Sequence, residues 1–243
     1  MSVERGSDFM PPEVDTSKLA DVKSQAGLLS DRVYQVIRDA ILKLDFEPGA
    51  VIRKAPICER LEISRSPVAD ALKKLASEGL VDVIPQSATR VSKLSMEAIR
   101  EESFIREALE VAAIGRAAKI RTDEQLGKLQ RNLRMQEMLV EDGDFDEFYR
   151  YDEEFHELLQ VSSGISRMVP AVELHTLQVH RARLLLLPEP GRTSDTVVEH
   201  QKILDAVRAQ DVSGAQTAMR QHLSQLIKRL EPLEKERPEL FDS

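Results

Sequence analysis

The stretch that most constrains the fold of this chain is residues 61–72, with the sequence LEISRSPVADAL. Ser64 is a favourable helix N-cap, and Pro67 stands in the first helical turn, where proline is tolerated. One apolar helix face is predicted by three residues spaced i, i+4 and i+7, namely Val68, Leu72 and Leu75. Arg65 and Ser66 therefore come at the helix N-terminus, beside free backbone N–H groups and the positive end of the helix dipole. Such a tip suits insertion into a DNA major groove, although an ordinary capped surface helix would show the same pattern.

The segments around this stretch predict a winged helix-turn-helix. A helix is expected over residues 30–43, a short helix over 56–61, and the central helix over 64–78. Two short strands are then expected on either side of residues 85–89, from the alternating valines Val81, Val83 and Val91. Three helices followed by a β-hairpin is the order that a recognition helix and a wing require.

From Ser95 onward the pattern is helical throughout and predicts a mainly α protein with a small β-wing. Six helices are expected, over residues 97–119, 123–141, 144–161, 165–187, 194–209 and 212–232. The loops between them are short, so the helices should pack as antiparallel neighbours in a six-helix bundle. The chain then has four expected regions: a flexible leader over 1–28, the winged domain over 29–95, the helical domain over 96–232 and a frayed, charged tail over 233–243.

The charge of the chain is unevenly distributed. The formal net charge is −8, which by itself argues against binding to nucleic acid. Residues 51–95, however, contain eight Lys and Arg against five Asp and Glu, and residues 1–95 as a whole are neutral. Residues 96–243 therefore carry the whole negative charge. A mildly basic small segment beside an acidic larger one indicates two domains with different partners.

Composition excludes several classes of protein. No apolar run approaches the ~18 residues needed to span a membrane, and the N-terminus shows no apolar segment of a secretory signal. The single cysteine, Cys58, excludes an internal disulfide and a cysteine-cluster metal site. We therefore expect a cytoplasmic protein without a membrane partner.

One carboxylate and three histidines have spacings that suit a common site. Asp152 and His156 are four residues apart and share one helix face. His200 and His222 lie on the last two expected helices, each eleven residues from the turn at Asp211, which is about 16 Å along its own helix. In an antiparallel hairpin the two histidines lie at matching depth. One carboxylate and three imidazoles suit a divalent metal, Zn²⁺ first, with Ni²⁺, Fe²⁺ and Mn²⁺ as alternatives.

Simpler interpretations compete with this site. Each histidine alone is more often a core or surface residue than a ligand, and we interpret His175 and His180 as structural. A di-iron bundle would need Glu-x-x-His twice, and only Glu153 with His156 matches, because Val197 and Met219 precede the other two histidines. The chain also has no Gly-rich phosphate loop and no nucleophile elbow.

The sequence resembles the GntR family of bacterial transcription regulators, in its FadR-type subfamily with an all-helical effector domain, over about residues 29–232. The N-terminal resemblance rests on Pro48-Gly49, Ser64-Arg65-Ser66-Pro67-Val68, Ala71-Leu72 and Glu78-Gly79-Leu80-Val81. The C-terminal resemblance rests on Arg106 with Glu110, Asp152 with Phe155-His156, Glu199-His200 with Ile203, Ala206 and Asp211, and Met219 with His222-Leu223. Six helices after the linker resemble the VanR-like branch.

The resemblance implies roles for particular residues. It implies that Asp152, His156, His200 and His222 bind a divalent metal, and that Arg106 faces the same cavity and pairs with a carboxylate effector. The chain departs from the family at Leu44, Glu62 and Ala88, where glycine is usual. It also has Ala69 in place of a second arginine on the recognition helix, and Ala55 near a position that often carries another.

We therefore expect a homodimeric repressor that responds to a metabolite and binds a palindromic operator in double-stranded DNA. Arg65 would read guanine, with help from Arg53 or Lys54. Phosphates would be held by Ser64, Ser66, Lys73, Thr89 and Arg90. The carboxylate effector would meet the metal and Arg106, with Arg181 or Arg183 as further contacts or as solvated surface residues. Two alternatives stay open: a metal-dependent enzyme fused to a DNA-binding module, and a purely structural metal site.

Overall fold

The computed structural model describes residues 12–23, 27–84 and 88–242. The chain divides into two compact units. Unit 1 consists of residues 1–94 and 239–243, and unit 2 consists of residues 95–238. Because each unit has its own core, we describe each by itself.

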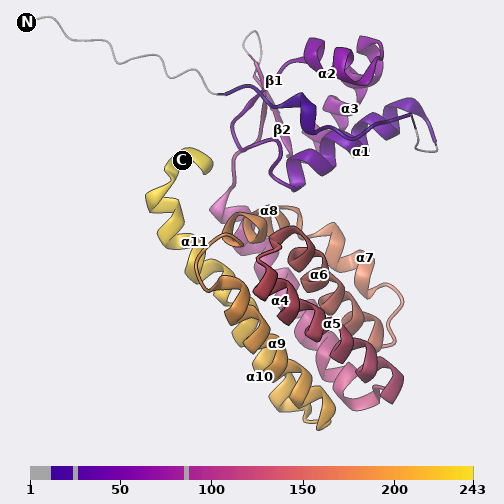
Figure 1. The fold of residues 1–243 in the computed structure, drawn as a ribbon, viewed down its shortest axis with the longest axis vertical. Helices are drawn as coiled ribbons and strands as arrows, with labels where there is room; N and C mark the ends of the chain where they lie inside the picture. Colours follow the sequence, from indigo (N-terminus) through magenta and orange to yellow (C-terminus); the bar gives the residue numbers. More distant parts are fainter. Residues whose placement is uncertain (1–11, 24–26, 85–87, 243) are drawn as a thin grey trace, which may run out of the picture. The chain divides into compact units, whose positions relative to one another are not determined.

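Unit 1 is a winged helix-turn-helix, as predicted (Figure 1). Its helices are α1 (Leu29–Leu42), α2 (Lys54–Leu61) and α3 (Arg65–Ser77). Its antiparallel sheet has the order β1-β3-β2, with β1 (Val51–Ile52), β2 (Val81–Val83) and β3 (Thr89–Val91). The tip of the hairpin, residues 85–87, lies outside the described residues. Helix α3 packs on α1 and α2 through its predicted apolar face, on which Val68 and Leu75 are fully buried.

Two residues of unit 1 have a left-handed backbone that usually requires glycine. Leu44 has a φ of 61° and Glu62 a φ of 54°. Glu62 is the C-cap of α2, and its N–H donates to the carbonyl oxygens of Cys58 and Glu59. Both positions keep the turn geometry that glycine adopts without strain, although a side chain in this conformation costs about 1–2 kcal/mol.

The prediction of a flexible leader over residues 1–28 is wrong for the described part of that segment. Leu19 and Val22 are 2% and 1% exposed. A short 3-10 helix, Thr16–Lys18, precedes them, and the N–H of Val14 donates to the carbonyl of Val51 at 3.0 Å. Residues 1–11 and 24–26 lie outside the described residues. An isolated pair of apolar residues has no period, so only the tertiary fold shows that this segment is packed.

The prediction of a frayed tail over residues 233–243 is also wrong. Helix α11 (Gln225–Glu236) continues through Pro232 and is followed by a 3-10 turn, Pro238–Leu240. Phe241 is only 3% exposed. The N–H of Leu94 donates to the carbonyl of Leu240, and the N–H of Asp242 donates to that of Leu94, each at 2.9 Å. Residues 239–242 therefore belong to unit 1, where Phe241 forms an isolated parallel β-bridge with Leu94.

Unit 2 is entirely helical, and all of its residues are described. Its helices are α4 (Met96–Ile120), α5 (Asp123–Asp142), α6 (Phe145–Ser162), α7 (Met168–Leu174), α8 (Leu177–Leu186), α9 (Arg192–Arg208), α10 (Val212–Leu223) and α11. The six expected helices are thus eight, because the helix expected over 165–187 breaks into α7 and α8, and the one over 212–232 breaks at Ser224.

The break before α8 has a tertiary cause. The Oε2 atom of Glu102, on α4, accepts hydrogen bonds from the N–H groups of Gln178 at 2.8 Å and Val179 at 3.0 Å. These are N–H groups that a helix start leaves without an intrahelical partner. A cap from a residue more than 70 positions away cannot be read from local sequence, which explains why this helix start was missed.

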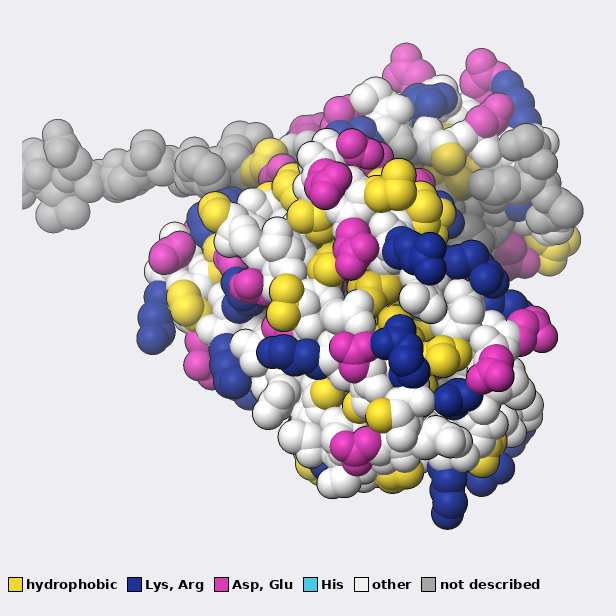
Figure 2. Space-filling model, turned by 60° about the horizontal axis from the view of Figure 1, so that its bottom comes forward, with side chains coloured by type: hydrophobic (Ala, Val, Ile, Leu, Met, Phe, Trp, Pro, Cys, Tyr) yellow, Lys and Arg dark blue, Asp and Glu magenta, His cyan; other side chains and the backbone are white. Residues whose placement is uncertain are grey.

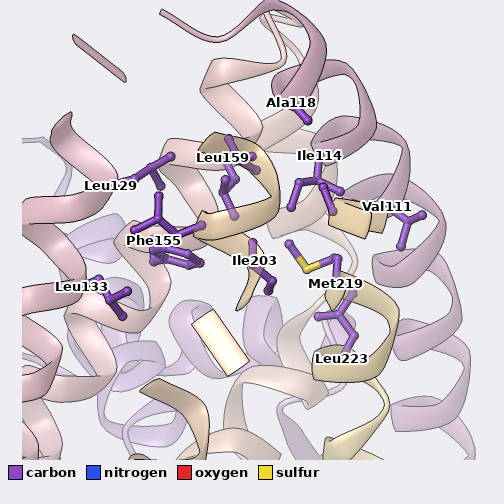
Figure 3. Close-up of a cluster of buried hydrophobic side chains, with 13 residues drawn as sticks. Val111, Ile114, Ala118, Leu129, Leu133, Phe155, Leu159, Ile203, Met219 and Leu223 are labelled. Carbon is purple, nitrogen blue, oxygen red and sulfur yellow. The ribbon is translucent and has the colours of Figure 1, made fainter. Parts of the chain in front are cut away.

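The core of unit 2 lies between α4, α5, α6, α9 and α10. Buried apolar side chains from these helices converge there, among them Ile114, Phe155, Leu159, Ile203 and Met219 (Figure 3). Phe155 also stacks on the ring of His200, with ring centroids 4.2 Å apart. The apolar core therefore forms one wall of the histidine cluster.

The acidic excess of residues 96–243 does not gather in one patch on the face drawn in Figure 2. On that face basic and acidic side chains lie interspersed among hydrophobic ones. Among the described residues, no helix is both long and apolar enough to cross a membrane.

Truncating Phe241 tests the placement of residues 239–242 in unit 1. We expect Phe241→Ala to lower the free energy of unfolding of unit 1 by about 3 kcal/mol, because it removes a fully buried aromatic side chain. Hydrogen exchange at the amides of α1 and α3 measures this directly. Glu236→Ala, at an exposed position nearby, should change stability by less than about 0.5 kcal/mol. Equal exchange rates in both variants would mean that the tail contributes nothing to the unit.

Candidate metal centre and nucleic-acid interface

The structure brings together the four residues that the sequence singled out as metal ligands. Asp152 and His156 lie one turn apart on α6, His200 lies on α9 and His222 on α10. All four side chains are buried, and one ligand atom from each lies within 4.8 Å of the others. Four polar side chains that converge in an apolar interior have lost their hydration, so they need a binding partner that compensates for this loss.

Each histidine of the cluster is held by an oxygen outside it. The Nδ1–H group of His156 donates to Glu110 Oε2 at 2.6 Å. Those of His200 and His222 donate to Gln136 Oε1 at 2.8 Å and to Glu199 Oε2 at 2.7 Å, respectively. A carboxylate or amide oxygen can only accept, so the proton of each imidazole must be on Nδ1. The Nε2 lone pairs are therefore free to point inward, as in metal-binding histidines.

The inward-facing atoms lie close together and lack protons to share. His156 Nε2 and His222 Nε2 are 3.2 Å apart, and His200 Nε2 is 3.4 Å from Asp152 Oδ1. His200 Nε2 is buried and has no hydrogen-bond partner among the described residues. Lone pairs facing lone pairs repel one another, so this arrangement fits a cation at its centre.

Of the three residues whose oxygens hold the histidines, two are singled out by the sequence, and only as parts of the family signature. Glu110 follows Arg106 by one helical turn, and Glu199 precedes His200, and both belong to the pattern by which the chain resembles the GntR family. Gln136 was not predicted. Its Nε2 donates to Asn132 Oδ1 at 2.8 Å, which turns its oxygen toward His200. Nothing in the local sequence of α5 distinguishes this glutamine from an exposed one.

Two arginines lie beside the cluster. Arg106 Nε donates to Glu110 Oε1 at 2.6 Å, and this pair is buried. Burial raises the pKa of Glu110, but Arg106 and His156 outweigh it and hold the pKa well below its usual range. Arg183 donates to Asp152 Oδ2, and its guanidinium lies 4.7 Å above the ring of Tyr149. Burial lowers the pKa of Arg183 to about 10, so it remains cationic at neutral pH.

A cavity of about 160 Å³ adjoins the cluster. Arg106, His156 and Arg183 line it, and so does His180, which sequence reasoning left as structural. His180 Nδ1 lies 2.8 Å from the hydroxyl of Tyr149 and 3.0 Å from Glu153 Oε1. Arg181 is placed elsewhere: it is fully buried, and its Nη1 donates to Gln178 Oε1 at 3.3 Å. The cavity is about half the ~300 Å³ at which pockets for drug-sized ligands begin, so it suits a small metabolite.

The second candidate site is the N-terminal end of α3. Arg65 is the first residue of this helix, and Ser64, Arg65 and Ser66 are all exposed. Ser64 occupies the N-cap position, but its hydroxyl makes no capping hydrogen bond. Exposed N–H groups and an exposed arginine thus share one helix tip, which is the chemistry that a phosphate or a guanine edge accepts.

The other predicted DNA contacts lie on or beside α2, α3 and β3 and differ in exposure. Arg53 and Lys54 are exposed at the start of α2, where Arg53 Nε pairs with Glu13 Oε1 at 2.5 Å. Lys73 is exposed on α3, whereas Thr89 and Arg90 are half-buried on β3. The exposed set is therefore Arg53, Lys54, Ser64, Arg65, Ser66 and Lys73.

Comparisons with known proteins agree with this two-part organisation. Residues 29–91 match the family described as bacterial regulatory proteins, gntR family, and residues 103–225 match the FCD domain. The chain is 29% identical over 213 residues to the HTH-type transcriptional repressor RspR of Escherichia coli (strain K12), covering 88% of this chain and 93% of RspR. It is 34% identical over 209 residues to an HTH-type transcriptional regulator in an unstable DNA locus of Streptomyces ambofaciens, covering 86% and 88% of the two chains.

Solved structures share the fold. E. coli McbR/YncC superposes with a TM-score of 0.71 at 22% identity, over 86% of this chain and 99% of its own. A transcriptional regulator from Rhodococcus sp. RHA1 superposes with a TM-score of 0.69 at 21% identity, over 84% and 97%.

The protonation of the buried histidines predicts how stability depends on pH. Burial lowers the pKa of His200 and His222 well below 6.5, and the charges of neighbouring histidines lower it further. Below pH ~6.5 the unfolded chain therefore takes up protons that the folded chain does not. The free energy of unfolding of the metal-free protein should fall by up to about 1.4 kcal/mol per pH unit for each such histidine.

Chemical denaturation at pH 7.5, 6.5 and 5.5 measures this slope. His222→Gln should make it shallower, and His175→Gln, which changes an exposed histidine, should leave it as it is. The attribution to the buried cluster fails if His222→Gln and the unsubstituted protein lose stability in parallel.

Proposed function

The chain belongs to the GntR family of bacterial regulatory proteins and carries an FCD domain, and we propose that it is a repressor released from DNA by a small carboxylate bound at a metal site. It is a DNA-binding transcriptional regulator, and its matched domains are those of regulators, not of enzymes. The finer part of the proposal is carried by one observation: four buried side chains turn their ligand atoms toward one centre beside a cavity that two arginines line.

The proposal of repression follows the names of relatives. RspR is called a repressor, and so is the gluconate operon transcriptional repressor of Bacillus licheniformis, which is 27% identical over 188 residues. Each of these names describes that protein alone. A repressor blocks transcription by occupying its operator, so its control requires that a ligand lower its affinity for DNA.

We propose that two copies bind a palindromic operator in double-stranded DNA. A dimer places two recognition helices on half-sites one helical turn apart. On α4, Phe104 is 76% exposed, and Ala108 and Ala112 continue the same exposed face over the next two turns. A large exposed aromatic residue beside small ones is a surface on which a second helix can pack closely, so we assign this face of α4 to the homodimer.

We propose Zn²⁺ as the metal held by Asp152, His156, His200 and His222, with Ni²⁺, Fe²⁺ or Mn²⁺ as alternatives. Three imidazoles and a carboxylate are typical zinc ligands, and zinc when bound supplies a Lewis acid that accepts an anionic oxygen. Glu110, Gln136 and Glu199 hold the imidazoles in the tautomer that binding requires.

The arginines beside the cluster support a carboxylate as the effector. Arg106 and Arg183 line the cavity and are cationic, and planar guanidinium groups bind carboxylates with two parallel hydrogen bonds. A purely structural metal site would need no such cavity, and this one holds more than a single water. Arg181 does not line the cavity, so we do not include it among the effector contacts.

Replacing Arg65 tests the DNA-reading role of the helix tip. Arg65→Ala should weaken binding to the specific operator by about 1–3 kcal/mol per half-site, because one arginine–guanine contact is lost. Binding to random DNA should change little, since the substitution removes only one positive charge that could contact a phosphate. Electrophoretic mobility or anisotropy assays at fixed salt measure both affinities. Lys128→Ala, which removes an exposed cation from unit 2, is the matched control, and equal losses on both DNAs would exclude base reading by Arg65.

Removing two ligands tests the metal site. Elemental analysis should find about one metal ion per chain in the purified protein and almost none in the double variant His200→Ala/His222→Ala. Adding Zn²⁺ at 100 times its Kd should stabilise the unsubstituted metal-free protein by about 2.7 kcal/mol in thermal unfolding. His175→Ala should behave like the unsubstituted protein. A folded double variant that holds no metal yet is still released from DNA by the effector would refute a role for the metal.

A further inference from the structure

We propose that the ligand of the cavity is a small zwitterion, with a carboxylate at the inner end and an ammonium group at the mouth. This inference rests on the proposed function, because it takes the inner end of the cavity as the carboxylate site. It adds a selection rule: a second negative charge on the ligand is rejected, and a positive charge is favoured.

The inner end of the cavity is basic once the proposed divalent metal is bound, because Arg106, Arg183 and the metal together outweigh Glu110, which also lines the cavity, and Asp152. Arg106 is 6% exposed, the side chain of Arg183 is 14% exposed, and both line the cavity together with His156. Their charges are fixed in place, because Arg106 is bonded to Glu110 and Arg183 to Asp152. A carboxylate entering the cavity therefore has its favourable partners at this end.

The mouth of the cavity is acidic. Glu157, on α6, and Glu173, on α7, are exposed residues that line the cavity. Neither carboxylate has a hydrogen bond or an ion pair with any residue that the structure describes. Glu153 lines the same wall one turn before Glu157, but its carboxylate is already bonded to the hydroxyl of Tyr149 at 2.9 Å and lies 3.0 Å from His180 Nδ1.

This arrangement gives the cavity a fixed polarity. A ligand in the cavity shares its walls with two unpaired carboxylates from different helices, Glu157 and Glu173, while its inner end meets two arginines. An ammonium group at the mouth would pair with Glu157 and Glu173, whereas a second carboxylate would be repelled by them. The volume of about 160 Å³ limits the ligand to a short chain, so five-carbon acids are suitable probes.

Three probes with the same number of carbon atoms separate these cases: pentanoate, 5-aminopentanoate and glutarate. Their affinities for the zinc-loaded, full-length protein can be compared by isothermal titration calorimetry at constant ionic strength. An exposed ion pair changes an affinity by about two- to five-fold, so two pairs should make 5-aminopentanoate bind about ten-fold more tightly than pentanoate. Glutarate should bind more weakly than pentanoate by a similar factor.

Two variants assign the preference to the mouth. The double variant Glu157→Gln/Glu173→Gln should bring the three affinities to within about two-fold of one another. Glu147→Gln is the matched control, because it removes one negative charge from α6 at a position that does not line the cavity, where Glu147 pairs with Arg150. It should keep the full preference. All three positions are exposed, so the substitutions leave the core intact.

Each outcome decides between the inference and the function on which it rests. Equal binding of pentanoate and 5-aminopentanoate, or tighter binding of glutarate, would overturn the zwitterion while leaving a carboxylate effector in place. A preference that survives in the double variant would overturn the assignment to Glu157 and Glu173. If zinc binds and none of the three acids does, the carboxylate effector and the zwitterion both fail.

Discussion

The hydrogen bonds from the three imidazole Nδ1 atoms to Glu110, Gln136 and Glu199 are the interactions on which unit 2 depends. They fix the tautomer of each ring, and so they decide that lone pairs, not protons, face the centre. They also join α4, α5 and α9 to the helices that carry the ligands. The same few bonds thus orient the candidate metal site and hold five helices around it, which makes the site part of the core.

The described parts of the fold could be predicted where the signal is local. The N-cap, proline and apolar spacing at residues 61–78 predicted the recognition helix, and spacing alone brought Asp152 and His156 to one helix face. The meeting of His200 and His222 followed from their symmetry about Asp211. What the sequence could not show are contacts made at long range: the cap that Glu102 supplies to α8, the turning of Gln136 toward His200, and the burial of Leu19 and Val22.

Departures from the pattern that the family resemblance implies also have a physical meaning in the structure. Leu44 and Glu62, where the resemblance implies glycine, both keep the left-handed backbone that glycine would adopt without strain. The turns after α1 and before α3 are therefore preserved at a cost in stability. Ala69 is half-buried on α3 and presents only a methyl group, where the resemblance implies a second arginine. Strain at the turns leaves the helix in place, whereas an alanine at this position cannot make the base contact that an arginine could make.

The placement of residues 239–242 beside Leu94 has a consequence for how the protein is made. The polypeptide leaves unit 1 at residue 94 and returns to it only at residue 239, so unit 2 is topologically an insertion within unit 1. During synthesis from the N-terminus, the helices that read DNA emerge long before the C-terminal segment that completes their unit. Unit 2 can therefore fold before the DNA-binding unit is complete. The order of synthesis thus places the completion of unit 2 ahead of the completion of the unit that binds DNA.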